Sequence, residues 1–248
     1  MTPARALAIV RIAVGVLFLV RTTPILMPLG FHWAHAPLLG WPDGKFHIAI
    51  FSLPAWVVAA LAIVRTLAAI AFTLGFRARD AGIVASVCAY VVLAQDALSY
   101  INTLHLLFMS TFLVAIADTS SSGLWLVRAI PLGVYVFSGI AKLNAQFLSG
   151  RTLIELRADG FLRGFVASFA CASPGRAHAV SIAVVACELT LPFLLAFPRT
   201  RLVALVLAVT FHATIEVSMH PDLFGWIMIT LLVAFIPGLP LRRGRSHT

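Results

Sequence analysis

One lysine inside an apolar stretch has the clearest capacity for chemistry in this chain. Lys142 lies in the segment SGIAKLNAQFLSG, where the small residues Ser138, Gly139 and Ala141 allow another helix or a ligand to approach closely. A lysine removed from water gives up its proton more readily, so a buried lysine is a candidate general base. The residues alone leave two interpretations open: Lys142 is a general base, or it anchors the end of its helix.

Three other ionisable side chains lie in long apolar stretches. His212 and Glu216 are four residues apart in FHATIE, which is about one helical turn, so they share one face of a helix. Glu188 opens the stretch ELTLPFLLAFPRTR. Each of the three could line a site or hold helices together. A single histidine with distant carboxylates does not match the ligand spacing of a metal site, so we predict no bound metal.

The elements that must position these residues are membrane-spanning helices. The chain has 248 residues, of which 61% are hydrophobic and 11% are charged, and a soluble domain of this length cannot cover so much apolar side chain. The net charge of +9 is spread over loop and helix ends and forms no aromatic-interleaved basic patch, so no nucleic acid partner is expected. We therefore predict an all-α integral membrane protein whose main partner is the lipid bilayer.

Apolar stretches of spanning length predict a bundle of about eight transmembrane helices in one domain, residues 1–248, since a span needs about 20 mostly apolar residues. The expected spans are about 6–29, 53–75, 81–101, 104–117, 124–145, 178–197, 202–218 and 222–239. With the N-terminus inside, eight of the basic residues between spans fall on the cytoplasmic side and five on the other. This bias favours a multi-pass protein with both termini cytoplasmic.

Two segments between the expected spans have a distinct character. Residues 30–51 contain tryptophans, histidines and prolines, which predicts an external loop with interfacial aromatics. Residues 147–176 mix apolar side chains with four arginines and two acids. Such a composition is typical of an amphipathic segment that lies in the membrane interface beside the bundle.

The segment around Lys142 resembles a family signature. SGIAKLNAQFLSG is similar to the pattern AG-x-x-KL-x-x-x-W-x-x-G of the vitamin K-dependent gamma-carboxylase-like proteins, with Phe147 at the tryptophan position. Their membrane region is also called the horizontally transferred transmembrane domain. Four further segments follow the family's order: LGFRARDAGIVASVCAYV, SYINTLHLLFMSTFLVAIAD, ELTLPFLLAFPRTRLVALVLAVTFHATIEV and LFGWIMITLLVAFIP. The resemblance covers roughly residues 5–240.

This resemblance implies a membrane-embedded enzyme that uses a reduced quinone (vitamin K or a menaquinol-like molecule) and oxygen, together with carbon dioxide if it carboxylates. In the carboxylases an active-site lysine deprotonates the hydroquinone, and the strong base formed after oxygen adds removes a proton from a glutamate. By position in the motif that lysine is Lys142. The site residues implied beside it, which would line or orient the quinone or substrate site, are Asn102, His105, Asn144, Glu188, His212 and Glu216.

The chain also departs from the family pattern. The family often has an Asn-His pair at the start of the fourth span, whereas this chain reads Asn102-Thr103 with His105 two residues later. The large extramembrane domain that holds a protein substrate in the animal carboxylase is not expected in this sequence. A peptide or a small metabolite is therefore the expected substrate, an accessory subunit could contribute, and the composition rich in alanine and arginine suggests the cytoplasmic membrane of a bacterium.

A non-catalytic role is the alternative hypothesis. The protein could be a membrane partner in the maturation or export of a secreted peptide or a lipid-like intermediate, with Lys142 as a structural ion-pair partner of Glu188 or Glu216. An apolar cavity that reaches the amine would favour chemistry, whereas a close carboxylate in filled surroundings would favour structure. A transporter is a third possibility, but the sequence shows no clearly repeated halves.

Overall fold

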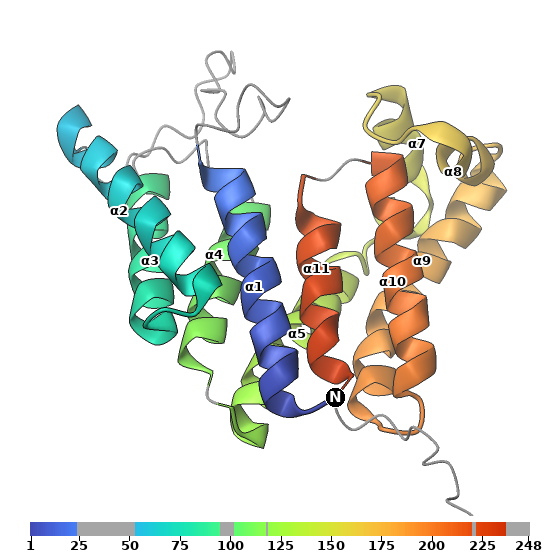
Figure 1. Cartoon of the computed structure of the whole chain (residues 1–248). Helices are drawn as coiled ribbons and strands as arrows, with labels where there is room; N and C mark the ends of the chain where they lie inside the picture. Colours follow the sequence, from blue (N-terminus) through green and yellow to red (C-terminus); the bar gives the residue numbers. More distant parts are fainter. Residues whose placement is uncertain (24–52, 95–101, 118, 220–221, 237–248) are drawn as a thin grey trace, which may run out of the picture. The chain divides into compact units, whose positions relative to one another are not determined.

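The computed structural model describes residues 1–23, 53–94, 102–117, 119–219 and 222–236 (Figure 1). All regular secondary structure in these ranges is helical, which confirms the predicted all-α class. The predicted loop at 30–51 lies outside the described residues.

Five of the described helices are long and apolar enough to cross a membrane. They are α1 (Pro3–Thr22), α2 (Ala55–Leu74), α5 (Ser121–Ala141), α9 (Pro174–Ala196) and α10 (Arg201–Met219). Shorter helices occupy the other predicted spans: α3 (Ala78–Leu93), α4 (Asn102–Ile116) and α11 (Phe224–Leu232), which continues as the 3-10 turn η4 (Val233–Phe235). The protein is therefore a multi-pass integral membrane protein, and the number of eight crossings stays a prediction.

The described helices separate by their contacts into two compact units, residues 3–127 and residues 128–248 with the first two residues. In the unit of residues 3–127, α2 packs against α3 and α1, and α4 packs against α3 and α1. The rings of Phe18 and Phe108 meet there with their centroids 5.3 Å apart. Gly82 lets α3 approach closely, because a Cβ at this position would lie 2.7 Å from the ring of Phe72. The predicted single domain of residues 1–248 stays a prediction.

In the unit of residues 128–248, α9 and α10 run antiparallel and α11 packs against α10 (Figure 1). Three short helices connect α5 to α9: α6 (Ala145–Leu148), α7 (Arg151–Ala158) and α8 (Gly164–Ala170). Helices α6, α7 and α8 contact α9, and α8 also contacts α10. The chain between α5 and α9 thus packs against the two long helices rather than extending away from them.

The predicted amphipathic segment, residues 147–176, contains α7 and α8. Leu153, Leu162 and Ala167 form a small buried core, and Leu156 and Cys171 pack against it. Arg151 and Gln146 both hydrogen bond to Glu155 on the exposed side of α7, and these bonds lower the pKa of the Glu155 carboxyl. The segment therefore has one buried apolar side and one exposed polar side, as the sequence predicts.

Buried arginines bind the carboxyl ends of helices. Arg65 donates from Nη2 to the carbonyl of Thr22 at the end of α1, over 2.5 Å. Arg201 donates to the carbonyls of Leu195 and Ala196 at the end of α9, over 3.0 and 3.1 Å. Because the last carbonyls of a helix lack intrahelical partners and carry partial negative charge, a cation there satisfies both needs.

Candidate functional site

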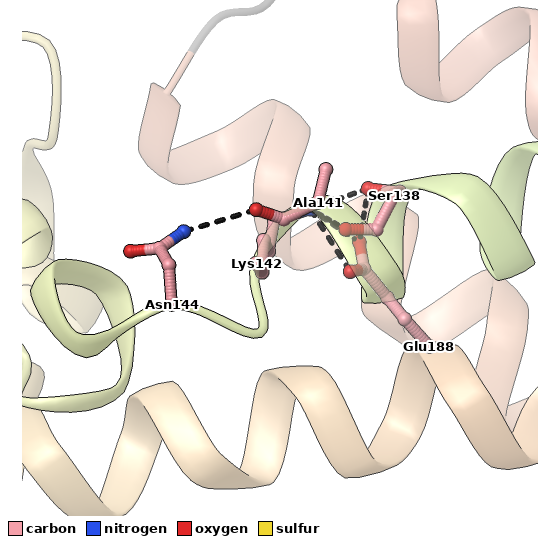
Figure 2. A network of polar contacts seen from close by, with 5 residues as sticks. All are labelled: Ser138, Ala141, Lys142, Asn144 and Glu188. Atoms are coloured by element: carbon pink, nitrogen blue, oxygen red, sulfur yellow. Dashed lines mark hydrogen bonds and ion pairs between the residues drawn. The ribbon is translucent and has the colours of Figure 1, made fainter.

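Lys142 and Glu188 form an ion pair where α5 ends beside α9. Lys142 Nζ lies 2.9 Å from each carboxylate oxygen of Glu188 and also donates to the hydroxyl of Ser138. That hydroxyl donates to Glu188 Oε1 over 2.9 Å (Figure 2). The Glu188 side chain is only 7% exposed, whereas the Lys142 side chain is 28% exposed. The pair therefore consists of a buried carboxylate and a partly accessible amine.

The hydrogen bonds of the Lys142 amine define its state in this structure. An ammonium group has three N–H donors and no acceptor. Its acceptors here are the Glu188 carboxylate, the Ser138 hydroxyl and the Ser138 carbonyl, the last at 3.4 Å. With three donors on three acceptors the amine has no free lone pair. A proton must leave before Lys142 can act as a base, and Glu188 is the neighbouring group that can accept one.

Local sequence brings the two helices close enough for this pair. Gly139 faces α9, since a Cβ there would lie 2.7 Å from Leu189 Cδ2 and 3.4 Å from Glu188 Cβ. Asn144 joins the end of α5 to the start of α6: its Nδ2 donates to the Ala141 carbonyl over 3.0 Å, and its Oδ1 accepts from the Phe147 amide over 2.9 Å. The printed bonds of Asn144 thus run to backbone groups, and in Figure 2 its side chain points toward Ala141 rather than to Glu188.

The rest of the SGIAKLNAQFLSG motif also packs around the pair or against α9. The buried ring of Phe147 lies with its centroid 5.8 Å from Lys142 Nζ, close enough for a cation–π contact. Gly150 has φ of +81°, and a Cβ there would lie 2.5 Å from the backbone nitrogen of His178. The glycine therefore meets both a left-handed backbone conformation and a close contact with α9.

A second polar pair lies deeper on the same face of α5. The Tyr135 hydroxyl and His212 Nε2 are 2.8 Å apart, and both side chains are 1% exposed. Tyr135 precedes Lys142 by seven residues, two helical turns, so the two side chains lie on one face of α5. His212 Nδ1 has no hydrogen-bond partner among the described residues, and the His212 ring packs between Phe211 and Phe224.

Glu216 binds a helix N-terminus in the structure. Its Oε1 accepts from the amide of Gly225 over 2.7 Å, in the first turn of α11. A Cβ on Gly225 would lie 2.6 Å from the same oxygen, so the glycine is what allows the carboxylate to reach the amide. A carboxylate at this position complements the free N–H groups of the helix start. Of the two acids that the sequence offers to Lys142, the structure pairs it with Glu188.

Asn102 and His105 belong to the unit of residues 3–127. Asn102 is exposed at the first position of α4. His105 Nδ1 lies 3.0 Å from the Tyr90 hydroxyl, which also donates to the His105 carbonyl over 3.1 Å. Both residues are thus placed within their own unit, and their predicted binding role stays a prediction.

Comparison with protein families places the Lys142 pair in a known domain. Residues 121–238 match the model of the HTTM domain. This part of the chain is an HTTM domain. The domain is shared with the vitamin K-dependent gamma-carboxylase-like proteins, which confirms the resemblance for this region. No curated protein and no solved structure matches the chain.

The HTTM domain contains residues at the site that the sequence did not single out. Ser138 was predicted only as a small residue, yet it bonds to both members of the ion pair. Tyr135 and Arg128 were not predicted, although Arg128, Tyr135 and Lys142 follow each other at seven-residue spacing. Arg128 donates to the carbonyl of Ala234 over 2.8 Å. A regular polar spacing in an apolar helix is the signal that could have indicated this buried face.

The described residues offer no evident metal ligands. No group of three His, Cys, Asp or Glu side chains within the described ranges could hold a metal ion. The chemistry available at the site is therefore that of an amine, a hydroxyl and a carboxylate.

Proposed function

We propose that the protein is a membrane enzyme of the gamma-carboxylase-like type, in which Lys142 removes a proton from a reduced quinone. Oxidation of the reduced quinone by oxygen would supply the driving force for modification of a peptide or small metabolite. The observation that carries the proposal is the hydrogen-bonded set of Lys142, Glu188 and Ser138 at the signature motif of an HTTM domain.

The different exposure of the two charges supports a chemical role. A base must contact its substrate, and the Lys142 side chain is 28% exposed while the Glu188 side chain is 7% exposed. In the proposal, a proton first moves from Lys142 to Glu188, which frees the amine lone pair. The hydroxyl of Ser138 holds the carboxylate in place during this transfer. Glu188 is thus the proton acceptor for Lys142 and need not touch the substrate.

The surroundings of the amine fit an apolar molecule that carries an acidic hydroxyl. The end of α5 and the turn after it expose Phe137 at 74%, Ile140 at 55% and Leu143 at 52%. A lipophilic ring with a long tail can contact such side chains from the bilayer, and its hydroxyl can reach the amine. The residues present are therefore compatible with a quinol.

The close carboxylate also supports the alternative, a non-catalytic partner in the maturation or export of a peptide or lipid-like intermediate. In that case the ion pair only holds α5 to α9. A buried ion pair can often be replaced by apolar residues at little cost in stability, so a purely structural pair should be replaceable without loss of function.

Quinol turnover by the purified protein tests the proposal. We would measure oxygen consumption and quinone epoxide formation in detergent with reduced menaquinone, for the wild type, Lys142→Met and Glu155→Gln. Glu155→Gln is a matched control, because it removes one member of an exposed ion pair with Arg151 outside the site. We expect epoxide from the wild type and from Glu155→Gln, and none from Lys142→Met. No epoxide from the wild type, or equal amounts from wild type and Lys142→Met, would overturn the proposal.

A further inference from the structure

The exposed side of α8 and the turn before it carries three phenylalanines. Phe161 is 62% exposed, Phe165 is 83% exposed and Phe169 is 55% exposed. The rings of Phe165 and Phe169 stack with their centroids 6.5 Å apart. Aromatic side chains are favoured at the boundary between hydrocarbon and water, where the ring meets the apolar region. Three of them on one short segment form an apolar surface that nothing described in the structure covers.

Two arginines border this surface with donors available for a ligand. The guanidinium of Arg176 lies over the ring of Phe169, 5.5 Å from its centroid. The hydrogen bond of Arg176 is made by its backbone amide, so its guanidinium has no acceptor among the described residues. Arg163 donates from Nε to the Gly160 carbonyl, and its Nη groups have no acceptor in the described ranges. Guanidinium groups of this kind are suited to phosphate.

The surface is fixed to the ends of membrane-spanning helices. Helix α8 contacts α9 and α10, and the Arg163 amide donates to the Ser218 carbonyl in the last turn of α10 over 2.8 Å. Val217, beside that carbonyl, is 72% exposed. The exposed apolar side chains of α10 therefore continue to the end of the helix at which α8 is attached. The end of a span is where hydrocarbon gives way to phosphate head groups.

We propose that this surface, formed by Phe161, Phe165, Phe169, Arg163 and Arg176, binds the bilayer interface with a preference for anionic phospholipids. The phenylalanines enter the outer part of the hydrocarbon, and the two arginines bind lipid phosphates. Continuity with the exposed side of α10 and the unpartnered guanidinium groups both indicate lipid as the occupant. The inference does not depend on the proposed function.

Spin labels test the depth of the surface. We would replace the native cysteines, introduce Phe165→Cys or Arg151→Cys, and measure the accessibility of each label to oxygen and to a water-soluble nickel complex in nanodiscs. Arg151 is the control, because its side chain is 74% exposed on α7. We expect the label at position 165 to favour oxygen and the label at position 151 to favour nickel. A label at 165 that favours nickel, or that neither reagent reaches because a protein partner covers it, would overturn the proposal.

Lipid preference gives a second measurement. Binding of fluorescent phosphatidylglycerol by the protein in phosphatidylcholine nanodiscs would be compared among the wild type, Arg163→Gln/Arg176→Gln and Arg199→Gln. Arg199 is an exposed arginine at the opposite end of α9, so it serves as a control of equal charge change. An arginine near an anionic surface contributes about 1 kcal/mol, so we expect roughly a fivefold loss of affinity per arginine. Equal affinities for the three proteins would contradict the assignment.

Discussion

Removing the charges of Lys142 and Glu188 one at a time and together should have very different effects on stability. Lys142→Met leaves Glu188, whose side chain is 7% exposed, with only the Ser138 hydroxyl as a printed donor. Breaking a buried pair in this way costs about 3 kcal/mol, the lower end of the usual range. Glu188→Met leaves an amine that is 28% exposed and can reach water, so the loss should be about 1–2 kcal/mol.

The double variant should be nearly as stable as the wild type. With both charges gone no unpaired ion remains, and apolar side chains of similar size can pack in their place. The expected coupling between the two sites is therefore about 3 kcal/mol. The free energy of unfolding would be measured for all four proteins in lipid bicelles by reversible trapping of the unfolded state. A double variant that loses the sum of the two single losses would refute the reasoning.

Three further predictions concern the residues that position the pair. Gly150→Ala should destabilise more than Gly164→Ala in thermal unfolding, because both have positive φ but only a Cβ at 150 meets the backbone of α9; equal shifts would contradict a close approach. Arg201→Met should cost about 2 kcal/mol for its lost bonds to helix-end carbonyls, while exposed Arg199→Met should be neutral, and equal losses would remove the capping role. Phe147→Leu should cost about 1 kcal/mol, measured as unfolding free energy, and this cost should shrink in a Lys142→Met background; an unchanged cost would exclude the cation–π contact.

The fold class could be predicted because a bilayer imposes a simple pattern. Each of the eight apolar stretches contains a described helix, since backbone groups in hydrocarbon must be paired within the helix. Some boundaries differ. Helix α9 starts at Pro174 rather than near 178, because Ser173 caps it by accepting from the Arg176 amide and proline is favoured at the first helical position. Both signals are local and could have been used.

The pairing at the site was only partly predictable. The sequence offered Glu188 and Glu216 as partners for Lys142, but the choice depends on how α5 lies against α9 and on the position of α11. The structure uses Glu216 to bind the start of α11 and leaves Glu188 for the lysine. Asn144 was predicted as a binding residue from its place in the motif, and its bonds to Ala141 and Phe147 depend on the turn after α5, which composition does not specify.

The most direct test of the proposed chemistry uses the variant Lys142→Met/Glu188→Met, which should fold as well as the wild type. Epoxide formation from reduced menaquinone under air would be measured for both proteins after their unfolding free energies are shown to agree. The account predicts epoxide from the wild type and none above the protein-free control from the double variant. Epoxide at the wild-type level from the stable double variant would contradict a catalytic role for Lys142.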